Sequence, residues 1–387
     1  MIDLLLDQAA DPAREPAFLR DIAAHIAAVE ASARAKDRRQ VARAEAAVRA
    51  DPQTAFGFDA TGNATLHAGT TSLAAGHFAT PSIAELRSRA AQAHTSTTSG
   101  RVRLWILDGA SPATDIGSLQ AGAPPGTLFQ VASQFNCLEA PGAQIVPVAD
   151  YFGDPTQGPR ASISAYSGTL LRHYAAPDGH GGRFVQTSDG PQINLLDAVC
   201  APGVATVRSG YLTARNIADR ATFIAALERD FESLRVGVHD DLPVLLGYNW
   251  DGAVAGEPRI GQVFTSTFAG GGYSGVRPDD PRYLPICTAL LRAAYLGTLL
   301  AAAVLGRHHV VLTLIGGGVF GNLIPLIWEA IRWAASEVEP LLGNDMNVIV
   351  NGRNLGEHLR IADLMPAVRA SGGAALVFGG PEAKIVR

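Results

Sequence analysis

Apolar and polar positions alternate along this chain with two different periods, and these periods predict its secondary structure. Short β-branched and apolar runs bounded by Gly, Pro, Asn or Asp predict strands, whereas longer stretches with a helical repeat predict helices. From residue 100 onward the predicted strands are residues 102–107, 127–132, 235–238, 310–315 and 347–351, with a further strand within residues 258–266. The predicted helices are residues 160–174, 220–234 and 284–305, with another directly after residue 322. Residues 108–126 and 177–192 are predicted to be loops. Strands alternating with helices predict an α/β sandwich around a mixed, mostly parallel sheet.

The first hundred residues show a different pattern. Residues 1–50 are rich in Ala, Arg and Glu with helical spacing, which predicts one or two helices. Residues 54–68 alternate around a Thr-Gly-Asn turn and predict a hairpin. Ser82, followed by Glu85 three positions later, predicts a capping box at the start of a helix. We therefore expect an N-terminal helical and hairpin extension over residues 1–100 and one larger α/β domain over residues 101–387.

The composition suits a globular protein with a large core. Hydrophobic residues make up 47% of the 387 positions and charged residues 17%. The stretch from Leu284 to Leu305 is apolar enough for a membrane span, but Arg292 interrupts it and small residues dominate, so we expect a core helix and no membrane partner. The N-terminal apolar run is short and lacks a basic start, which predicts a cytoplasmic location. Delivery as an effector through a non-cleaved signal is the alternative.

Charge and cysteine content narrow the possible partners further. The formal net charge of -5 argues against a nucleic-acid partner, which usually requires a basic face. The three cysteines form no CxxC pair, and the histidines lack metal-ligand spacing. We therefore expect no metal site, no dithiol redox chemistry and no bound cofactor.

A glycine-rich loop between a predicted strand and a predicted helix is the most informative feature. Glycines let backbone N–H groups approach a phosphate closely, and the helix dipole favours negative charge at its N-terminus. We therefore expect this loop to hold a phosphate or pyrophosphate of a nucleotide-like ligand. The alternative is that its glycines only permit tight strand–helix packing. The residues concerned are Gly316, Gly317, Gly318, Val319, Phe320, Gly321 and Asn322.

This loop satisfies the GxGxxG pattern, but its context differs from a dinucleotide fingerprint. Such a fingerprint normally opens its domain and is followed by an acidic residue at the end of the second strand. Here the loop lies near the C-terminus, and the next predicted strand ends in Asn351. A Walker loop is excluded because no Lys-Ser or Lys-Thr follows the glycines. An NAD-dependent enzyme therefore stays only as an alternative.

A second segment places polar residues beyond the carboxyl end of a predicted strand. The predicted strand at residues 127–132 is followed closely by Asn136, beyond the carboxyl end, where ligands bind in open α/β sheets. Thr156, Gln157 and Gly158 then stand at the start of the next predicted helix. Backbone N–H groups and side-chain donors there can also bind an anion.

The order of these motifs resembles that of macrodomains, the ADP-ribose-binding fold. The similarity covers roughly residues 100–352 and is greatest to a divergent group of ADP-ribosyl hydrolases that includes bacterial effectors of the MavL type, which act on ADP-ribosylated ubiquitin. It implies a macrodomain-like three-layer sandwich in which the loop at residues 316–322 wraps the diphosphate. Asn136 would lie beside the distal ribose, and residues 156–158 would form the other ribose and phosphate loop. GDPTQGP replaces the usual glycine cluster, so individual ribose contacts are not assigned.

Release of ADP-ribose passes through an oxocarbenium-like transition state and needs a carboxylate to activate water or stabilise charge. The resemblance implies a catalytic aspartate pair, and Asp241 and Asp251 match it best. Aspartates in these positions also commonly form turns. Glu139 is a third candidate, as a ribose ligand, a general base or simply a solvated loop residue. Phe320 is a candidate for packing over the ribose or the adenine, with a plain core contact as the alternative. Tyr273 is a candidate for stacking from a glycine-rich loop.

Three functions follow from these expectations. The first is a hydrolase that removes ADP-ribose from a modified protein through a carboxylate-activated water. The resemblance implies arginine-linked ADP-ribose, with ubiquitin as the modified protein. The second is a non-catalytic ADP-ribose-binding module, which needs the glycine loops but not the aspartates. The third is the NAD-dependent enzyme.

Overall fold

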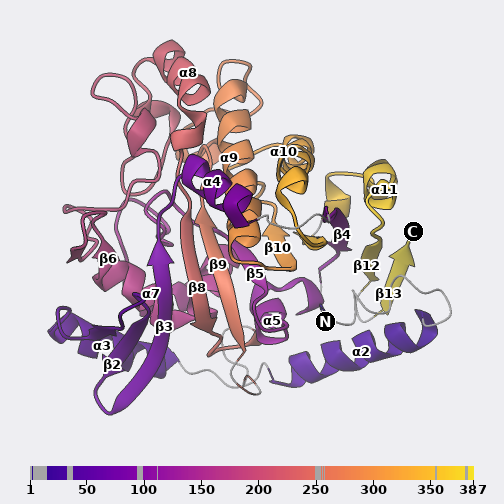
Figure 1. The fold of residues 1–387 in the computed structure, drawn as a ribbon, viewed down its shortest axis with the longest axis horizontal. Helices are drawn as coiled ribbons and strands as arrows, with labels where there is room; N and C mark the ends of the chain where they lie inside the picture. Colours follow the sequence, from indigo (N-terminus) through magenta and orange to yellow (C-terminus); the bar gives the residue numbers. More distant parts are fainter. Residues whose placement is uncertain are drawn as a thin grey trace.

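A single eleven-stranded sheet forms the centre of the computed structural model (Figure 1). The structure describes residues 15–32, 38–93, 99–110, 112–248, 258–353, 355–379 and 382–387, together with residues 2, 254 and 256. The strands are β1 (Phe56–Phe58), β2 (Ala64–Ala68), β3 (Thr71–Ala79), β4 (Val102–Asp108), β5 (Leu128–Ala132), β8 (Gly237–Pro243), β9 (Arg259–Thr265), β10 (His309–Thr313), β11 (Met346–Gly352), β12 (Ala375–Gly379) and β13 (Glu382–Val386). β6 (Ala176–Pro177) and β7 (Arg183–Phe184) form a separate ribbon.

The helices form layers on both faces of this sheet. They are α2 (Glu15–Ser32), α3 (Arg38–Ala50), α4 (Ile83–Ala93), α5 (Ile116–Ala121), α6 (Gln157–Ser164), α7 (Tyr166–Tyr174), α8 (Arg220–Arg229), α9 (Leu284–Val304), α10 (Ile324–Val338) and α11 (Ile361–Ala370). Gln130 of β5 donates a hydrogen bond to Ala294 of α9, and Gln262 of β9 donates one to Ala161 of α6. Gln262 lies opposite Phe129, the residue before Gln130, so the two glutamines point to opposite faces. α9 and α6 therefore cover different faces, and the predicted three-layer α/β fold is confirmed.

The sheet is mixed, with its parallel strands in the middle. Its order is β1-β2-β3-β8-β9-β5-β10-β11-β4-β12-β13. The pairs from β9 to β12 are parallel, whereas β1, β2, β3 and β8 on one side and β13 on the other pair antiparallel. All carboxyl ends of the parallel strands therefore meet at one edge, where ligands bind in sheets of this kind.

The N-terminal elements agree with the sequence prediction. Helices α2 and α3 occupy the predicted helical stretch, and β1 and β2 form the predicted hairpin. The Ser82 N–H donates to Glu85 Oε2 over 2.7 Å, and the Glu85 N–H donates to Ser82 Oγ over 3.2 Å, which confirms the capping box. β3 pairs with β8 and so continues the main sheet. A domain boundary at residue 100 stays a prediction.

Several predicted boundaries are wrong. The segment 108–126 contains α5, which begins where the Asp115 side chain accepts a hydrogen bond from Ser118 N–H. The helix predicted at residues 160–174 is divided at Ala165 into α6 and α7. The strand predicted to end at Val238 continues to Pro243. The elements α11, β12 and β13 were not predicted, because short apolar runs near the C-terminus have no clear period.

The apolar helix α9 is a core helix of this structure. Its length and hydropathy would suit a membrane span, but 78% of its most apolar window is buried inside the molecule. The guanidinium of Arg292, which interrupts the apolar run, lies 4.9 Å from the centre of the Trp333 ring. Packing against the sheet and the neighbouring helices accounts for the apolar character of α9.

Candidate active site

The carboxyl edge of the parallel strands carries polar atoms that need further partners. Within the described part of the chain, four buried oxygens at this edge have no hydrogen-bond partner. They are Thr265 Oγ1 at the end of β9, Thr313 Oγ1 at the end of β10, Asn351 Oδ1 near the end of β11 and Glu139 Oε1 after β5. Buried polar atoms without a partner are uncommon and are frequently completed by a ligand or water. This edge is therefore the candidate site.

The glycine loop after β10 is a closed turn that leads into α10. Gly316 and Gly321 both have φ of 70°, a region that favours glycine. A Cβ at Gly316 would lie 2.3 Å from Thr267 Cγ2, so only glycine fits. The Asn322 N–H donates to Gly316 O over 2.9 Å, and its side-chain amide donates to Phe268 O over 3.1 Å. Asn322, a predicted ligand, thus closes the loop, while Val319 at its tip is 62% exposed.

The loop after β5 is held by Asn136. This side chain is fully buried; its amide donates to Gln192 Oε1 over 3.0 Å, and its oxygen accepts from Leu138 N–H over 3.1 Å. The next residue, Cys137, has φ of 62°, so the chain turns sharply there. Asn136 therefore lies at the predicted edge, but in this structure its polar atoms fix the loop that carries Glu139.

Glu139 is a buried carboxyl group, not a solvated one. The residue is 8% exposed, and its backbone N–H donates to the Tyr151 hydroxyl over 2.8 Å. Burial raises the pKa of Glu139 well above its ordinary value, Arg172 opposes that change, and Asp154 adds to it. A carboxyl group with a raised pKa in a site of this kind is a candidate general acid or base.

The start of α6 lies directly beside this carboxyl group. Gly158 is the second residue of α6, and a Cβ built there would come within 2.7 Å of Glu139 Oε2. Gln157 Oε1 accepts a hydrogen bond of 2.9 Å from Ile116 N–H, so its side chain joins α6 to α5. Thr156 is exposed, and its N–H donates to Asp154 Oδ1 over 2.9 Å. The structure thus brings Gly158 to Glu139, whereas a ligand role for residues 156–158 stays a prediction.

Three aromatic rings connect the two loops. Tyr211 and Tyr273 are stacked with ring centres 5.1 Å apart, and Phe320 of the glycine loop lies edge-on, 5.2 Å from Tyr273 and 6.0 Å from Tyr211. The Tyr211 hydroxyl donates to Ala140 O and accepts from Gln134 Nε2, both in the loop that carries Glu139. Burial raises the pKa of Tyr211, so this hydroxyl keeps its proton. Tyr211 was not predicted as a site residue, because it stands in a loop without periodicity.

A buried polar network around Arg172, which contacts the loop that carries Glu139, was also not predicted from the sequence. Arg172 of α7 is 1% exposed, and its Nε donates to Cys137 O over 3.1 Å. Its guanidinium also contacts Thr169 Oγ1 and His239 Nδ1 and lies 3.6 Å from the centre of the Phe264 ring. Burial lowers the pKa of Arg172 to about 10, so it remains a cation at neutral pH. In the sequence, Arg172 is an ordinary basic residue near the end of a predicted helix. Only its burial in the structure distinguishes it from a surface residue.

Asp241 does not lie at this edge, which corrects the sequence expectation. It sits in a bulge of β8 with φ of 55°, and its carboxylate pairs with Arg259 over 3.1 Å. Two residues later, Pro243 lies opposite Arg259, the first residue of β9, so Asp241 is near the amino ends of the parallel strands. The strand continues past the predicted turn and carries Asp241 away from the glycine loop. Asp251, the other predicted catalytic aspartate, lies outside the described residues.

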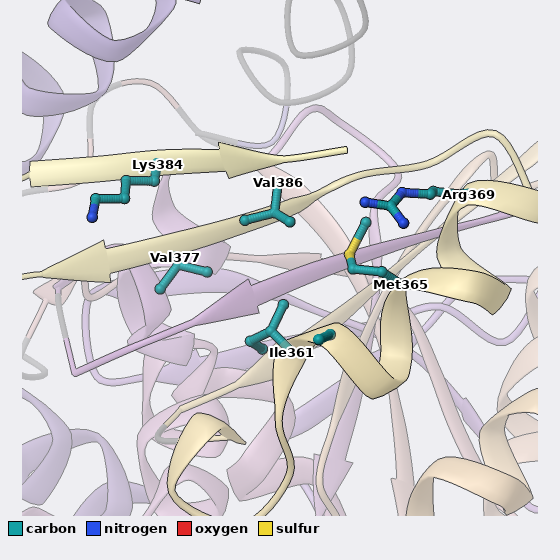
Figure 2. Close-up of a pocket in the computed structure, with 7 residues that line it drawn as sticks. Ile361, Met365, Arg369, Val377, Lys384 and Val386 are labelled. Carbon is teal, nitrogen blue, oxygen red and sulfur yellow. The ribbon is translucent and has the colours of Figure 1, made fainter.

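Two grooves elsewhere on the molecule contain none of the predicted site residues. One, of about 400 Å³, lies between α11 and the strands β12 and β13, and Figure 2 shows Arg369 and Lys384 at its margin among aliphatic side chains. The other, of about 590 Å³, lies between α8, α9 and Trp333 of α10. The candidate site is therefore defined by its buried polar groups and loop geometry.

Comparison with known proteins gives distant structural matches. No family model matches this sequence, and no curated protein sequence matches it. The fold is similar to that of poly(ADP-ribose) glycohydrolase from Deinococcus radiodurans in complex with ADP-ribose, with 13% identity, a TM-score of 0.40 and coverage of 74% of this chain and 95% of that one. It is also similar to poly(ADP-ribose) glycohydrolase from Thermomonospora curvata, with 13% identity, a TM-score of 0.39 and coverage of 81% and 93%. These values are too low to assign a family, and neither protein is an effector of the MavL type.

Proposed function

We propose that this protein is a hydrolase that removes ADP-ribose from a modified protein. The observation that carries the proposal is Glu139, a buried carboxyl group with an unpartnered oxygen at the carboxyl edge of the sheet. Burial of an acidic group that lacks hydrogen-bond partners costs stability, and such groups concentrate at functional sites. Its place beside the start of α6 puts it where an anionic ligand would bind.

The surrounding loops support a nucleotide diphosphate as the ligand. The glycine loop and the start of α6 both lie next to a helix N-terminus, which favours phosphate. The aromatic rings of Tyr211, Tyr273 and Phe320 connect the glycine loop to the loop that carries Glu139 and offer a surface for a ribose or a base. Asn351 stands near the end of β11, where a dinucleotide enzyme carries an acidic residue, which weighs against the NAD-dependent alternative.

In the proposed reaction, water attacks the anomeric carbon of the ribose while the bond to the protein side chain breaks. Glu139 in its protonated form donates a proton to the departing atom, and the carboxylate so formed takes a proton from the attacking water, which restores the carboxyl group. The raised pKa of Glu139 suits either role near neutral pH. Arg172 is a buried cation that stabilises the ionised form of Glu139 and so limits the rise in its pKa.

The finer points of the proposal rest on the sequence resemblance over residues 100–352. They are an arginine-linked ADP-ribose and ubiquitin as the modified protein. A cytoplasmic site of action, with delivery as an effector as the alternative, rests on the sequence prediction alone. Asp251 remains a proposed second carboxylate on the basis of the resemblance. Asp241 is left out because of its place at the opposite edge of the sheet.

Release of ADP-ribose from arginine-ADP-ribosylated ubiquitin is the direct test. The wild-type protein and a Glu139→Gln variant are incubated with it and with serine-linked and glutamate-linked substrates, and free ADP-ribose is measured. We expect release by the wild type and a loss of roughly 100-fold or more in the variant, in the range of a missing acid–base group. ADP-ribose binding without release from any substrate would favour the binding module instead. Binding of NAD but not ADP-ribose would favour the NAD-dependent enzyme.

A further inference from the structure

The N-terminal helix α3 supplies a buried carboxylate to the region of the site. Glu45 of α3 is 3% exposed, and its oxygens accept hydrogen bonds from Val148 N–H over 2.7 Å and from Ala149 N–H over 2.9 Å. It also accepts one from the Tyr174 hydroxyl over 2.8 Å. Val148 and Ala149 begin the 3-10 helix η2 (Val148–Gly153), whose preceding residue, Pro147, provides no side-chain cap. Glu45 therefore caps a helix that is about a hundred residues away in sequence.

Helix η2 connects Glu45 to Glu139 through the side chain of Tyr151. Tyr151 in η2 is buried, and its hydroxyl accepts the Glu139 N–H over 2.8 Å. The same hydroxyl lies 2.8 Å from His173 Nε2. Burial lowers the pKa of His173 to about 3, so the ring is neutral and Nε2 can accept the hydroxyl proton. The position of η2 thus sets the position of the Glu139 backbone.

A second connection reaches the same loop from strand β3. The His239 Nε2 atom donates to Ala75 O of β3 over 2.6 Å, because its Nδ1 accepts from the Arg172 guanidinium at 3.0 Å. Arg172 in turn donates to Cys137 O. The Cys137 carbonyl and the Glu139 N–H stand on either side of Leu138, so the two connections hold both sides of one short turn. Figure 1 shows α3 beside β2 and β3, on the side of the sheet formed by the first strands.

We propose that Glu45 is a positioning residue for Glu139, and that the N-terminal layer formed by α3 and β1–β3 is therefore part of the catalytic unit. The catalytic half of this inference, the effect of Glu45 on the reaction, rests on the proposed function. A carboxyl group that must meet a reacting atom tolerates little displacement, and an error near 1 Å can cost about 100-fold in rate. Removing the cap on η2 would release Tyr151 and with it Glu139.

The test compares Glu45→Gln with Glu85→Gln in the full chain. Glu85 is the control for capping, because it is also an N-terminal carboxyl group that accepts a backbone N–H, over 2.7 Å from Ser82. It is exposed, and its hydrogen-bond and ion-pair partners among the described residues are Ser82 and Arg235. We expect Glu45→Gln to lower kcat for ADP-ribose release by roughly 10- to 100-fold with KM within about threefold of wild type. Glu85→Gln should leave kcat within about twofold. Equal losses of kcat in both variants, or none in Glu45→Gln, would overturn the proposal.

A double-mutant cycle separates this route from general loss of stability. Tyr151→Phe removes the hydroxyl that holds Glu139, so the double variant Glu45→Gln/Tyr151→Phe should lose about as much kcat as Tyr151→Phe alone. Independent losses that multiply would contradict a shared route. All rates are measured well below the thermal transition of each variant, which keeps unfolding out of the comparison.

Amide hydrogen exchange tests the connection without any activity. Exchange in residues 134–140 should rise in Glu45→Gln and stay at the wild-type rate in Glu85→Gln. A wild-type protein with no hydrolysis would overturn the proposed function and the catalytic half of this inference. Unchanged exchange in Glu45→Gln would overturn the connection itself, whatever the activity of the wild type.

Discussion

Gly158 lies directly against Glu139 at the start of α6. A Cβ at this position would come within 2.7 Å of Glu139 Oε2 and 2.3 Å of the carbonyl oxygen of Ala132, the last residue of β5. The helix can approach the strand end and the carboxyl group only because this residue has no side chain. The closeness of α6 to Glu139 is thus determined by one glycine.

Gly158→Ala is expected to damage both stability and activity. The added methyl group meets backbone on one side and the carboxyl group on the other, and overpacking of this kind costs about 1–3 kcal/mol. Thermal unfolding should show the lower stability, and ADP-ribose release should fall by more than about tenfold. Gly142→Ala is the control, because a Cβ at Gly142 has nothing within 4 Å. A Gly158→Ala protein with wild-type stability and rate would contradict the contact.

Glu139→Gln should change the pH dependence of stability in a defined direction. The pKa of Glu139 is raised in the folded protein above its ordinary value of 4.5, with Asp154 adding to the effect of burial and Arg172 opposing it. At a pH between those two pKa values, the unfolded chain has lost a proton that the folded protein keeps. The contribution of Glu139 to the free energy of unfolding is therefore complete below the ordinary pKa and is lost as pH rises through the folded pKa. The Glu139→Gln variant does not lose stability in this way, because the Gln side chain does not titrate.

Thermal unfolding of wild type and Glu139→Gln from about pH 4 to about pH 8 is the measurement. The Tm of the variant relative to wild type should increase as pH rises, with the smallest difference at the acidic end. Loss of hydrolysis together with a gain in stability at neutral pH would be typical of a residue kept for function. A Tm difference that is constant with pH would show that the pKa of Glu139 is ordinary.

Phe320→Ala should weaken ADP-ribose binding without unfolding the protein. The ring of Phe320 contacts Tyr211 and Tyr273, and each aromatic pair contributes about 0.5–1.5 kcal/mol. Loss of these contacts loosens the connection between the glycine loop and the loop of Glu139, so Kd measured by calorimetry should rise about tenfold. Phe231→Ala removes a comparable edge-on contact with Trp333, away from the site, and should leave Kd unchanged.

Asp241→Asn should retain ADP-ribose release within about twofold of wild type. Asparagine tolerates the positive φ at this position, and the exposed ion pair with Arg259 contributes about 0–1 kcal/mol. A fall in kcat of more than tenfold with unchanged Tm would show that Asp241 takes part in the reaction, in conflict with its place in β8. Asp251→Ala, assayed beside it, tests the carboxylate that only the resemblance proposes.

Local patterns were enough to predict most elements and both loops of the candidate site. The apolar run before Gly316 and the glycines after it are neighbours in sequence, so the strand, the turn and the start of α10 could be predicted together. The same holds for β5 and Asn136 and for the Ser82–Glu85 capping box. Periodicity failed for α5, where glycine and proline concealed a short helix.

The sequence by itself determined the α/β layers, because helical and strand periods are properties of adjacent residues. It also determined that glycine loops would lie at strand ends. Only the tertiary structure decided that Glu139 is buried beside Gly158, that Asp241 lies at the other edge, and that Glu45 caps a distant helix. These relationships join residues far apart in the chain, and burial and pKa depend on which segments pack together. No local pattern carries that information.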